Sequence, residues 1–196
     1  DALVHTTVPV ASGLSSSDAI EMAIGRLLEA LAGVTIDAVQ LAILGQRAEN
    51  TFVGVNCGIL DQYTSSVGQA GCALLLDART LESRAVPIAQ GIAVVICDTR
   101  ARRELTGSEY GMRRAACEEG ARRLGAFYPE VVALRDMSSD QLEAVAGQLP
   151  EEVARRCRFI VAEDERVLKM ADALTAGDRV AIGGLAAGSF AGARDL

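Results

Sequence analysis

Aromatic residues are scarce in this sequence. Tryptophan is absent, and Phe and Tyr together make up only 4% of the 196 residues. Since half of the chain is nevertheless apolar, the core must be built mainly from Ala, Val, Leu and Ile, which suits close packing of helices on a sheet. No apolar run approaches the roughly 20 residues that cross a bilayer, so we expect no membrane partner. Residues 1–10 also lack the basic end and the apolar stretch of a secretory signal, which favours a cytoplasmic location.

Histidine and closely spaced cysteines are scarce as well. With His5 as the single histidine, a multi-histidine metal site or a histidine-based triad is hard to build. The five cysteines are far apart and include no C-x-x-C pair. Such spacing favours reduced thiols over a disulfide framework or a zinc site. We interpret Cys57 and Cys117 as small buried residues without redox work.

Positive charge is the third shortage. The formal net charge is −7, which repels a phosphate backbone at long range, so we expect no nucleic-acid partner. Arginine pairs do occur, but they are interleaved with glutamates, as on a solvated helix face. The pairs lie at 102–103, 113–114, 122–123 and 155–156. At Arg113 and Arg114 we expect ion pairs with acids.

The first quarter of the chain predicts a strand followed by two helices. The β-branched residues between 2 and 10 indicate a strand. After a turn at 13–17, apolar residues recur at helical spacing, and Gly33 closes this helix. A second helix begins near Thr35 or Asp37, which are both good capping residues.

The rest of the chain predicts strands and then helices. Three extended runs, at 72–77, 82–88 and 92–98, have lengths and separations that suit antiparallel strands. Helical patterns follow at 110–124, 140–146, 150–175 and 178–187, the last weakened by two glycines. Together these elements indicate an α+β fold whose sheets are covered on one face.

A run of small residues at 8–17, Val-Pro-Val-Ala-Ser-Gly-Leu-Ser-Ser-Ser, lies between the first predicted strand and the first predicted helix. Small residues let the backbone approach a ligand, and a helix start presents unpaired N–H groups with partial positive charge. This arrangement suits a phosphate, with serine hydroxyls adding hydrogen bonds or a magnesium contact. It is not a Walker A loop, because G-K-[ST] is absent. An ordinary helix start stays open as the alternative, since serine is a preferred cap.

The run at 8–17 resembles the second motif of the GHMP small-molecule kinases, P-x-x-x-G-L-S-S-S. Two later segments are similar to motifs of the galactokinases. Gly-Val-Asn-Cys-Gly-Ile-Leu-Asp-Gln at 54–62 is similar to G-x-x-C-G-x-x-D-Q, and Ser-Glu-Tyr-Gly-Met-Arg-Arg-Ala-Ala-Cys-Glu-Glu at 108–119 to S-E-Y-x-x-R-R-x-x-C-E-E. A weaker likeness lies at 163–178. In this order the resemblance covers nearly the whole chain.

The resemblance implies the two-lobed α+β fold of the GHMP kinases. In that fold the N-terminal lobe is like ribosomal protein S5 domain 2, and the C-terminal lobe is ferredoxin-like. We expect residues 1–85 to be the end of the first lobe, with the phosphate loop and the catalytic aspartate. Residues 86–196 would be the beginning of the second lobe, so both lobes are incomplete.

The resemblance also implies roles for single residues. Asp61 would orient the anomeric hydroxyl of a sugar and accept its proton, whereas without the resemblance it is a helix cap or a solvated acid. Without it, Glu49 would be one more exposed helix acid and Tyr110 a core residue. The resemblance assigns magnesium to Ser17 and Glu49, and the sugar to Gly58, Asp61 and Tyr110. It assigns ATP to Ala11, Ser12, Gly13, Leu14, Ser15, Ser16 and Ser17.

The activity implied by the resemblance is ATP-dependent phosphorylation of galactose at its anomeric hydroxyl, which gives α-D-galactose 1-phosphate for galactose catabolism. We expect direct in-line transfer without a phosphoenzyme, with Mg²⁺ as cofactor and ATP as co-substrate. We expect the full-length enzyme to be a monomer. One alternative is a related 1-kinase for N-acetylgalactosamine, arabinose or a uronic acid. Another is a non-catalytic sugar sensor on the same scaffold, although the full-length serine loop favours an enzyme.

The chain also departs from the galactokinase pattern. It has neither the G-E-H-x-D-Y segment, which brings sugar contacts and an arginine beside the catalytic aspartate, nor the glycine-rich motif near the family's C-terminus. We therefore expect an internal fragment that is inactive alone. Asp18 stands where the family has alanine. It suits the helix dipole but repels a triphosphate unless magnesium intervenes. Phe190 stands where the family has histidine.

Overall fold

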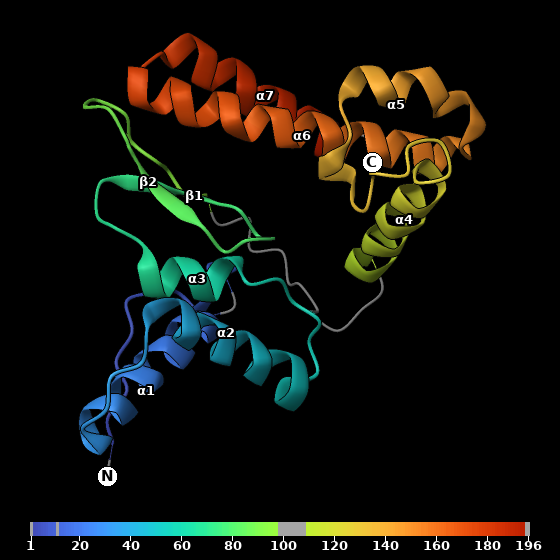
Figure 1. The fold of residues 1–196 in the computed structure, drawn as a ribbon. Helices are drawn as coiled ribbons and strands as arrows, with labels where there is room; N and C mark the ends of the chain where they lie inside the picture. The colour runs from blue at the N-terminus through green and yellow to red at the C-terminus, as the bar shows by residue number, and fades with distance from the viewer. Residues whose placement is uncertain (1, 11, 98–108, 195–196) are drawn as a thin grey trace. The chain divides into compact units, whose positions relative to one another are not determined.

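The computed structural model describes the backbone of residues 2–10, 12–97 and 109–194, and the side chains of the same residues except 109 and 110. The chain forms two compact units, Asp1–Thr106 and Gly107–Leu196. In Figure 1 the first runs from blue to green and the second from yellow to red. The predicted assignment of 1–85 and 86–196 to the two lobes of the kinase fold is a different division, and it stays a prediction.

The first unit contains three α-helices, a π-helical turn and a hairpin. These elements are α1 (Ser16–Ala32), α2 (Ala38–Ala48), η1 (Glu49–Val53), α3 (Leu60–Val67), β1 (Cys72–Leu76) and β2 (Ser83–Pro87). Gly33 ends α1 in the left-handed conformation, at φ 67°. Asp37 caps α2, because its carboxylate accepts hydrogen bonds from the backbone N–H groups of Val39 and Gln40. Both boundaries agree with the sequence prediction, whereas η1 and α3 were not predicted.

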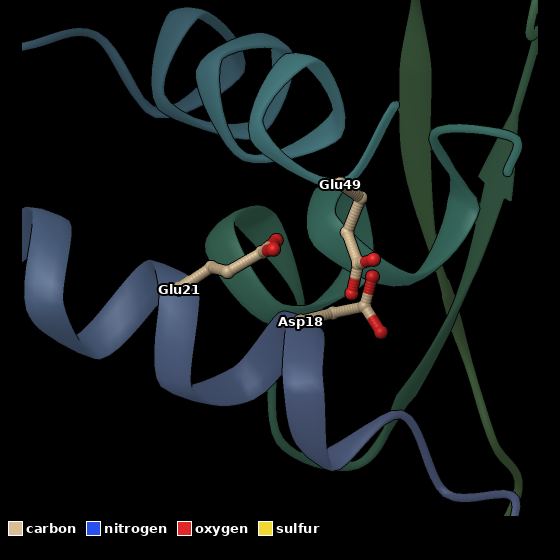
Figure 2. A group of neighbouring side chains, drawn as sticks. All are labelled: Asp18, Glu21 and Glu49. Carbon is tan, nitrogen blue, oxygen red and sulfur yellow. The ribbon is translucent and has the colours of Figure 1, made fainter. Parts of the chain in front are cut away.

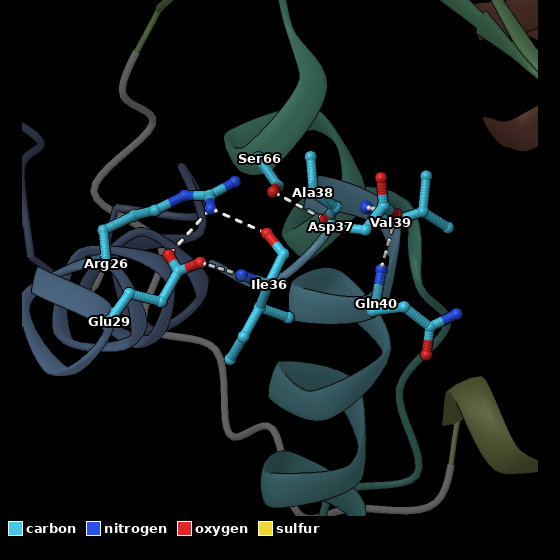
Figure 3. Close-up of polar contacts among 8 residues, drawn as sticks. All are labelled: Arg26, Glu29, Ile36, Asp37, Ala38, Val39, Gln40 and Ser66. Atoms are coloured by element: carbon cyan, nitrogen blue, oxygen red, sulfur yellow. Dashed lines mark hydrogen bonds and ion pairs between the residues drawn. The ribbon is translucent and has the colours of Figure 1, made fainter. Parts of the chain in front are cut away.

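A polar network holds the turn between α1 and α2 (Figure 3). The carboxylate of Glu29 is only 6% exposed, and it accepts hydrogen bonds from the backbone N–H of Ile36 and from the Arg26 guanidinium. The same Arg26 nitrogen donates to the carbonyl of Ile36, at 3.1 Å. Ser66 in α3 donates to the carbonyl of Ala38, at 2.7 Å. The network therefore joins all three helices.

An aromatic residue of α3 lies at the centre of its contact with the hairpin. Strands β1 and β2 pair antiparallel, as two of the three extended runs predict. Tyr63 of α3 is 2% exposed, and its hydroxyl donates to the carbonyl of Leu81 in the turn of the hairpin, at 2.8 Å. The core of this unit consists of Ala42, Ile59 and Tyr63, with Val39, Ile43, Val67, Leu74, Leu76 and Leu81 packed against them.

Two predicted strands are not formed. Residues 2–10 contain no strand, and neither do residues 92–97, while position 98 lies outside the described residues. β-Branched composition favours an extended backbone, but a strand also needs a neighbour for its N–H and C=O groups. Composition does not say whether such a neighbour lies alongside. Within the described residues, the sheet therefore has two strands.

The second unit is helical. Its elements are α4 (Glu109–Leu124), η2 (Leu134–Asp136), α5 (Ser139–Val145), η3 (Ala146–Gln148), α6 (Glu151–Ala176) and α7 (Arg179–Arg194). Its core includes the fully buried Leu124 and Cys157, and Gly120 of α4 lets α6 approach, since a Cβ there would lie 2.3 Å from the Cys157 Sγ. Helix α7 is longer than the predicted 178–187, because packing on α6 compensates for the weak propensity of its glycines. None of the described helices is long and apolar enough to span a membrane.

Ion pairs line the exposed side of α4, as the interleaved arginines predict. The Arg114 Nε lies 2.9 Å from the Glu118 Oε1. Glu119 pairs with both Arg122 and Arg123, and these two guanidinium groups lower the pKa of Glu119 to about 2. The predicted burial of Cys117 is only partial, since this thiol is half-buried.

Candidate active site

The predicted phosphate loop leads into α1 through left-handed backbone. Gly13 and Ser15 have φ values of 79° and 56°. Glycine adopts this left-handed conformation freely, whereas for a residue with a side chain, such as Ser15, it costs about 1–2 kcal/mol. Ser15 occupies the cap position of α1 without a side-chain capping hydrogen bond. Strained backbone of this kind concentrates at ligand sites. Gly13 and Ser17 are exposed, Ser12, Leu14, Ser15 and Ser16 are half-buried, and Ala11 lies outside the described residues.

Three carboxylates meet behind this loop, and we call Asp18, Glu21 and Glu49 the acid cluster. One ligand oxygen from each lies within 4.8 Å of the others. Figure 2 shows Asp18 and Glu49 pointing toward each other, from α1 and from the start of η1, with Glu21 beside them. Asp18 and Glu49 are each only 8% exposed. The predicted magnesium ligand Glu49 is therefore buried, and it has two acidic neighbours that the prediction did not include.

The acid cluster carries uncompensated negative charge. Within the described part of the chain, none of its three carboxylates forms an ion pair with Lys or Arg. Burial raises the pKa of Asp18, and the charges of Asp61 and Glu49 add to this. Burial and the charge of Glu49 raise the pKa of Glu21 to about 7. Asp61, which is exposed in the first turn of α3, thus lies close enough to act on the cluster.

The donor set of the acid cluster fits a hard divalent cation. Mg²⁺ and Ca²⁺ prefer carboxylate and hydroxyl oxygens, and buried carboxylates without a counter-ion are costly unless a cation binds. The Ser17 hydroxyl donates to the Asp18 Oδ2, at 3.1 Å, so the second predicted magnesium ligand borders the cluster. The chain thus places Ser17 and Glu49 in one region, with Asp18 between them.

The loop before α3 is held by amide side chains. The backbone N–H of Cys57 donates to the Asn50 Oδ1, at 3.0 Å, and the Gln46 amide donates to the Cys57 carbonyl, at 3.3 Å. Gly58 follows and is exposed. A Cβ at Gly58 would meet no atom of the described chain within 4 Å, so internal packing does not require glycine there. Cys57, predicted to be buried, is half-buried.

Tyr110, the third predicted sugar contact, belongs to the second unit. It lies in the first turn of α4, and its side chain lies outside the described residues. Its contact with a sugar therefore stays a prediction.

Comparison with known proteins supports the kinase resemblance. Residues 1–69 match the sequence profile of the GHMP kinases N terminal domain. The chain aligns over 195 residues with galactokinases of Chloroflexus aggregans (46% identity), Chloroflexus aurantiacus (44%) and a Roseiflexus species (46%), and these alignments cover all of the chain and half of each relative.

A solved structure extends the match to the fold. The crystal structure of Lactococcus lactis galactokinase complexed with galactose has a TM-score of 0.85 and 32% sequence identity to this chain, over 96% of the chain and 49% of that protein. The predicted GHMP kinase fold is confirmed, in a helix-rich α+β form with a small sheet. The chain spans about half the length of the curated relatives it matches.

Two members of the acid cluster could have been found in the sequence. Asp18 and Glu21 are three residues apart in a predicted helix, and that spacing places side chains on the same face. Which face turns toward Glu49 depends on how α1 packs against α2, and no sequence motif encodes that packing. The amides of Gln46 and Asn50 carry no recognisable signal, because the Cys57 loop that they contact lies 11 and 7 residues further along the chain, and no helical or strand spacing links them to it.

Proposed function

We propose that these residues belong to a kinase that transfers the γ-phosphoryl group of ATP to the anomeric hydroxyl of galactose. The observation that carries this proposal is the convergence of the serine loop, the acid cluster and Asp61 within the first unit. The 44–46% identity to three galactokinases supports it. Direct phosphoryl transfer needs positioning and charge neutralisation rather than covalent chemistry by the protein. The loop and Asp61 can supply the positioning, and a cation held by the acid cluster would supply the neutralisation.

Asp61 is the proposed base. Its carboxylate is exposed at the start of α3, so it can accept the proton of a bound hydroxyl while the sugar oxygen attacks phosphorus. Gly58 is the proposed backbone contact with the sugar, because the space beside it is free of described atoms. Tyr110 is the proposed third sugar contact.

The serine loop and the acid cluster are the proposed phosphate side of the site. Residues 11–17 would hold the phosphates through backbone N–H groups and hydroxyls, and Ser17 and Glu49 would hold Mg²⁺. When bound, this ion neutralises phosphate charge. Asp18 lies next to both proposed magnesium ligands, Ser17 and Glu49. Its carboxylate would therefore repel a nucleotide that arrives without a cation.

The test of the base is an Asp61→Asn variant of the full-length protein. Galactose-dependent ATP consumption should fall by about a hundredfold or more, since general-base catalysis contributes roughly 10²–10⁴-fold. Asp140→Asn is a matched control, because Asp140 is also an exposed acid in the first turn of a helix, α5. It should keep full activity. Equal activity of Asp61→Asn and the unmodified enzyme would refute the assigned base.

The choice of galactose has its own test. It rests on the names of the three relatives and on the galactose complex of the solved structure. A panel of galactose, N-acetylgalactosamine, arabinose and a uronic acid should give the highest kcat/KM for galactose. A value more than about tenfold higher for another sugar would reassign the acceptor. Binding of ATP and galactose without any turnover would favour a sensor.

We also propose that residues 1–196 have no activity alone. Helix α1 exposes Ile24, Leu27, Leu28 and Leu31, each 45–75% accessible to solvent, and a bare apolar face of this kind marks a contact surface. The expected result is sugar-dependent ATP turnover for the full-length protein and none for residues 1–196. Comparable rates for the two would contradict this proposal.

A further inference from the structure

Gln62 is the most deeply buried polar residue near the proposed base. It follows Asp61 in the first turn of α3, but neighbouring residues of a helix point about 100° apart. Asp61 is therefore exposed, whereas Gln62 is 0% exposed. A glutamine at such a position loses its hydration, so its amide must find partners within the protein.

The Gln62 amide touches both sides of the candidate site. Its Nε2 donates to the Cys57 Sγ, at 3.9 Å, in the loop that leads to Gly58. The Gln62 side chain also lies beside Glu21 of the acid cluster, since both approach the same point at Gly45, and it lowers the pKa of that carboxyl against the larger effect of burial. An amide nitrogen carries two hydrogens, so one side chain can serve both partners. Gln62 thus connects the phosphate side with the sugar side.

Helix α2 closes over this connection at a glycine. A Cβ at Gly45 would lie 3.1 Å from the Gln62 Cγ and 3.1 Å from the Glu21 Oε2. The close approach of α2 leaves the Gln62 Oε1 buried without a hydrogen-bond partner. A side chain that served packing alone would be better as an apolar residue of the same size, because it would leave no oxygen unpaired.

We propose that Gln62 is a positioning residue for the phosphoryl transfer. It fixes the start of α3 between the acid cluster and the Cys57 loop, and so it holds Asp61 at one place relative to the bound phosphates. This inference rests on the proposed kinase function. It predicts that Gln62 contributes to kcat rather than to substrate affinity, because misplacing a reacting group by about 1 Å costs up to a hundredfold in rate.

The test compares Gln62→Met with Tyr63→Phe in the full-length protein. Methionine keeps the volume of Gln62 and removes its hydrogen bonds. Gln62→Met should lower kcat by roughly tenfold to a hundredfold, leave both KM values within about threefold, and keep the unfolding midpoint. Tyr63 lies on the same helix as Gln62. Tyr63→Phe removes its buried hydroxyl, which donates to the Leu81 carbonyl in the turn of the hairpin. It should lower the midpoint and keep kcat.

A second measurement does not need turnover. Hydrogen exchange of the backbone across 54–60 should speed up in Gln62→Met and stay unchanged in Tyr63→Phe, because of these two side chains only that of Gln62 hydrogen-bonds the loop. In a double-mutant cycle, Cys57→Ala should add little to Gln62→Met, because both remove one contact. Unchanged exchange together with unchanged kcat would overturn the proposal. A wild-type enzyme without sugar-dependent turnover would instead refute the kinase function, and the exchange data would still decide whether Gln62 holds the loop.

Discussion

Asp18 changes the charge of the phosphate side of the site. The family motif has alanine here, whereas this chain places a third carboxylate within 4.8 Å of Glu21 and Glu49. Like charges this close repel one another and oppose folding when no cation is near. The same three carboxylates form a stronger cation site than two would. One substitution therefore opposes folding of the free protein and favours binding of a metal.

The variant Asp18→Ala separates these two effects. Without divalent cations, the unfolding midpoint should rise by roughly 2–4 °C, because a buried repulsive charge is removed. With millimolar Mg²⁺ this rise in the midpoint should shrink or reverse. The variant lacks the Asp18 carboxylate, so it binds the metal more weakly and gains less stability from metal binding. Thermal unfolding with and without Mg²⁺ measures both, and Mn²⁺ binding followed by electron paramagnetic resonance gives the affinity directly. Asp140→Ala is the control, and an unchanged midpoint for Asp18→Ala without cations would contradict the argument.

At the scale of single residues, the sequence predicts the chemistry of the site better than its surroundings. The motifs single out Ser17, Glu49 and Asp61, and the structure brings Ser17 and Glu49 to the same acid cluster, with Asp61 close enough to influence its charge. Gln62 is part of the quoted D-Q motif, but its role depends on contacts with Glu21 and Cys57. Those contacts exist only after α1, α2 and α3 have packed together, so the motif alone does not reveal them.

At the scale of elements, the turn between α1 and α2 depends on one carboxylate. Hydrogen bonds from the Ile36 N–H and then from Arg26 lower the pKa of Glu29 below its ordinary value of 4.5. An acid whose pKa is lower in the folded state stabilises the fold above its unfolded-state pKa. That contribution is lost as the pH falls through the folded-state value. The junction of the three helices is therefore expected to weaken in acid.

Glu29→Gln tests this junction. At pH 7 the variant should unfold at a lower urea concentration than the wild type, because a neutral amide cannot replace a carboxylate that accepts from both Arg26 and Ile36. The difference should disappear as the pH is lowered below about 4. Urea titrations at pH 7, 5, 4 and 3 measure it, with the exposed Glu130→Gln as control. A difference that stayed constant with pH would show that the charge of Glu29 is not what stabilises the turn.

Local capping and turn signals make some elements predictable from the sequence, whereas other elements carry no such signal. Gly33 and Asp37 carry local signals, so the ends of α1 and α2 agree with prediction. Helix α3 has apolar residues at helical spacing, Leu60, Tyr63 and Val67, but only eight residues and no side-chain cap, so local sequence gives little evidence for it. The strand predicted at 2–10 fails for the opposite reason, since its composition is favourable but pairing is a property of the whole fold.

At the scale of the whole molecule, the two units differ in how complete their cores are. The second unit has a core of eleven buried residues around α4, α5 and α6, whereas the core cluster of the first has three buried members. A helical unit with many local contacts folds readily by itself. A unit with bare apolar faces depends on further surface to cover them.

Residues 109–194 expressed alone are therefore expected to fold. They should show helical circular dichroism and one cooperative thermal transition. Leu142→Ala should cost this unit about 2–5 kcal/mol, because Leu142 is 1% exposed in its core and truncation leaves a cavity. Residues 2–97 alone should associate through the exposed face of α1, which sedimentation would detect. A second unit that melts without a transition, or that tolerates Leu142→Ala without loss, would show that its core is not the independent source of stability that its packing indicates.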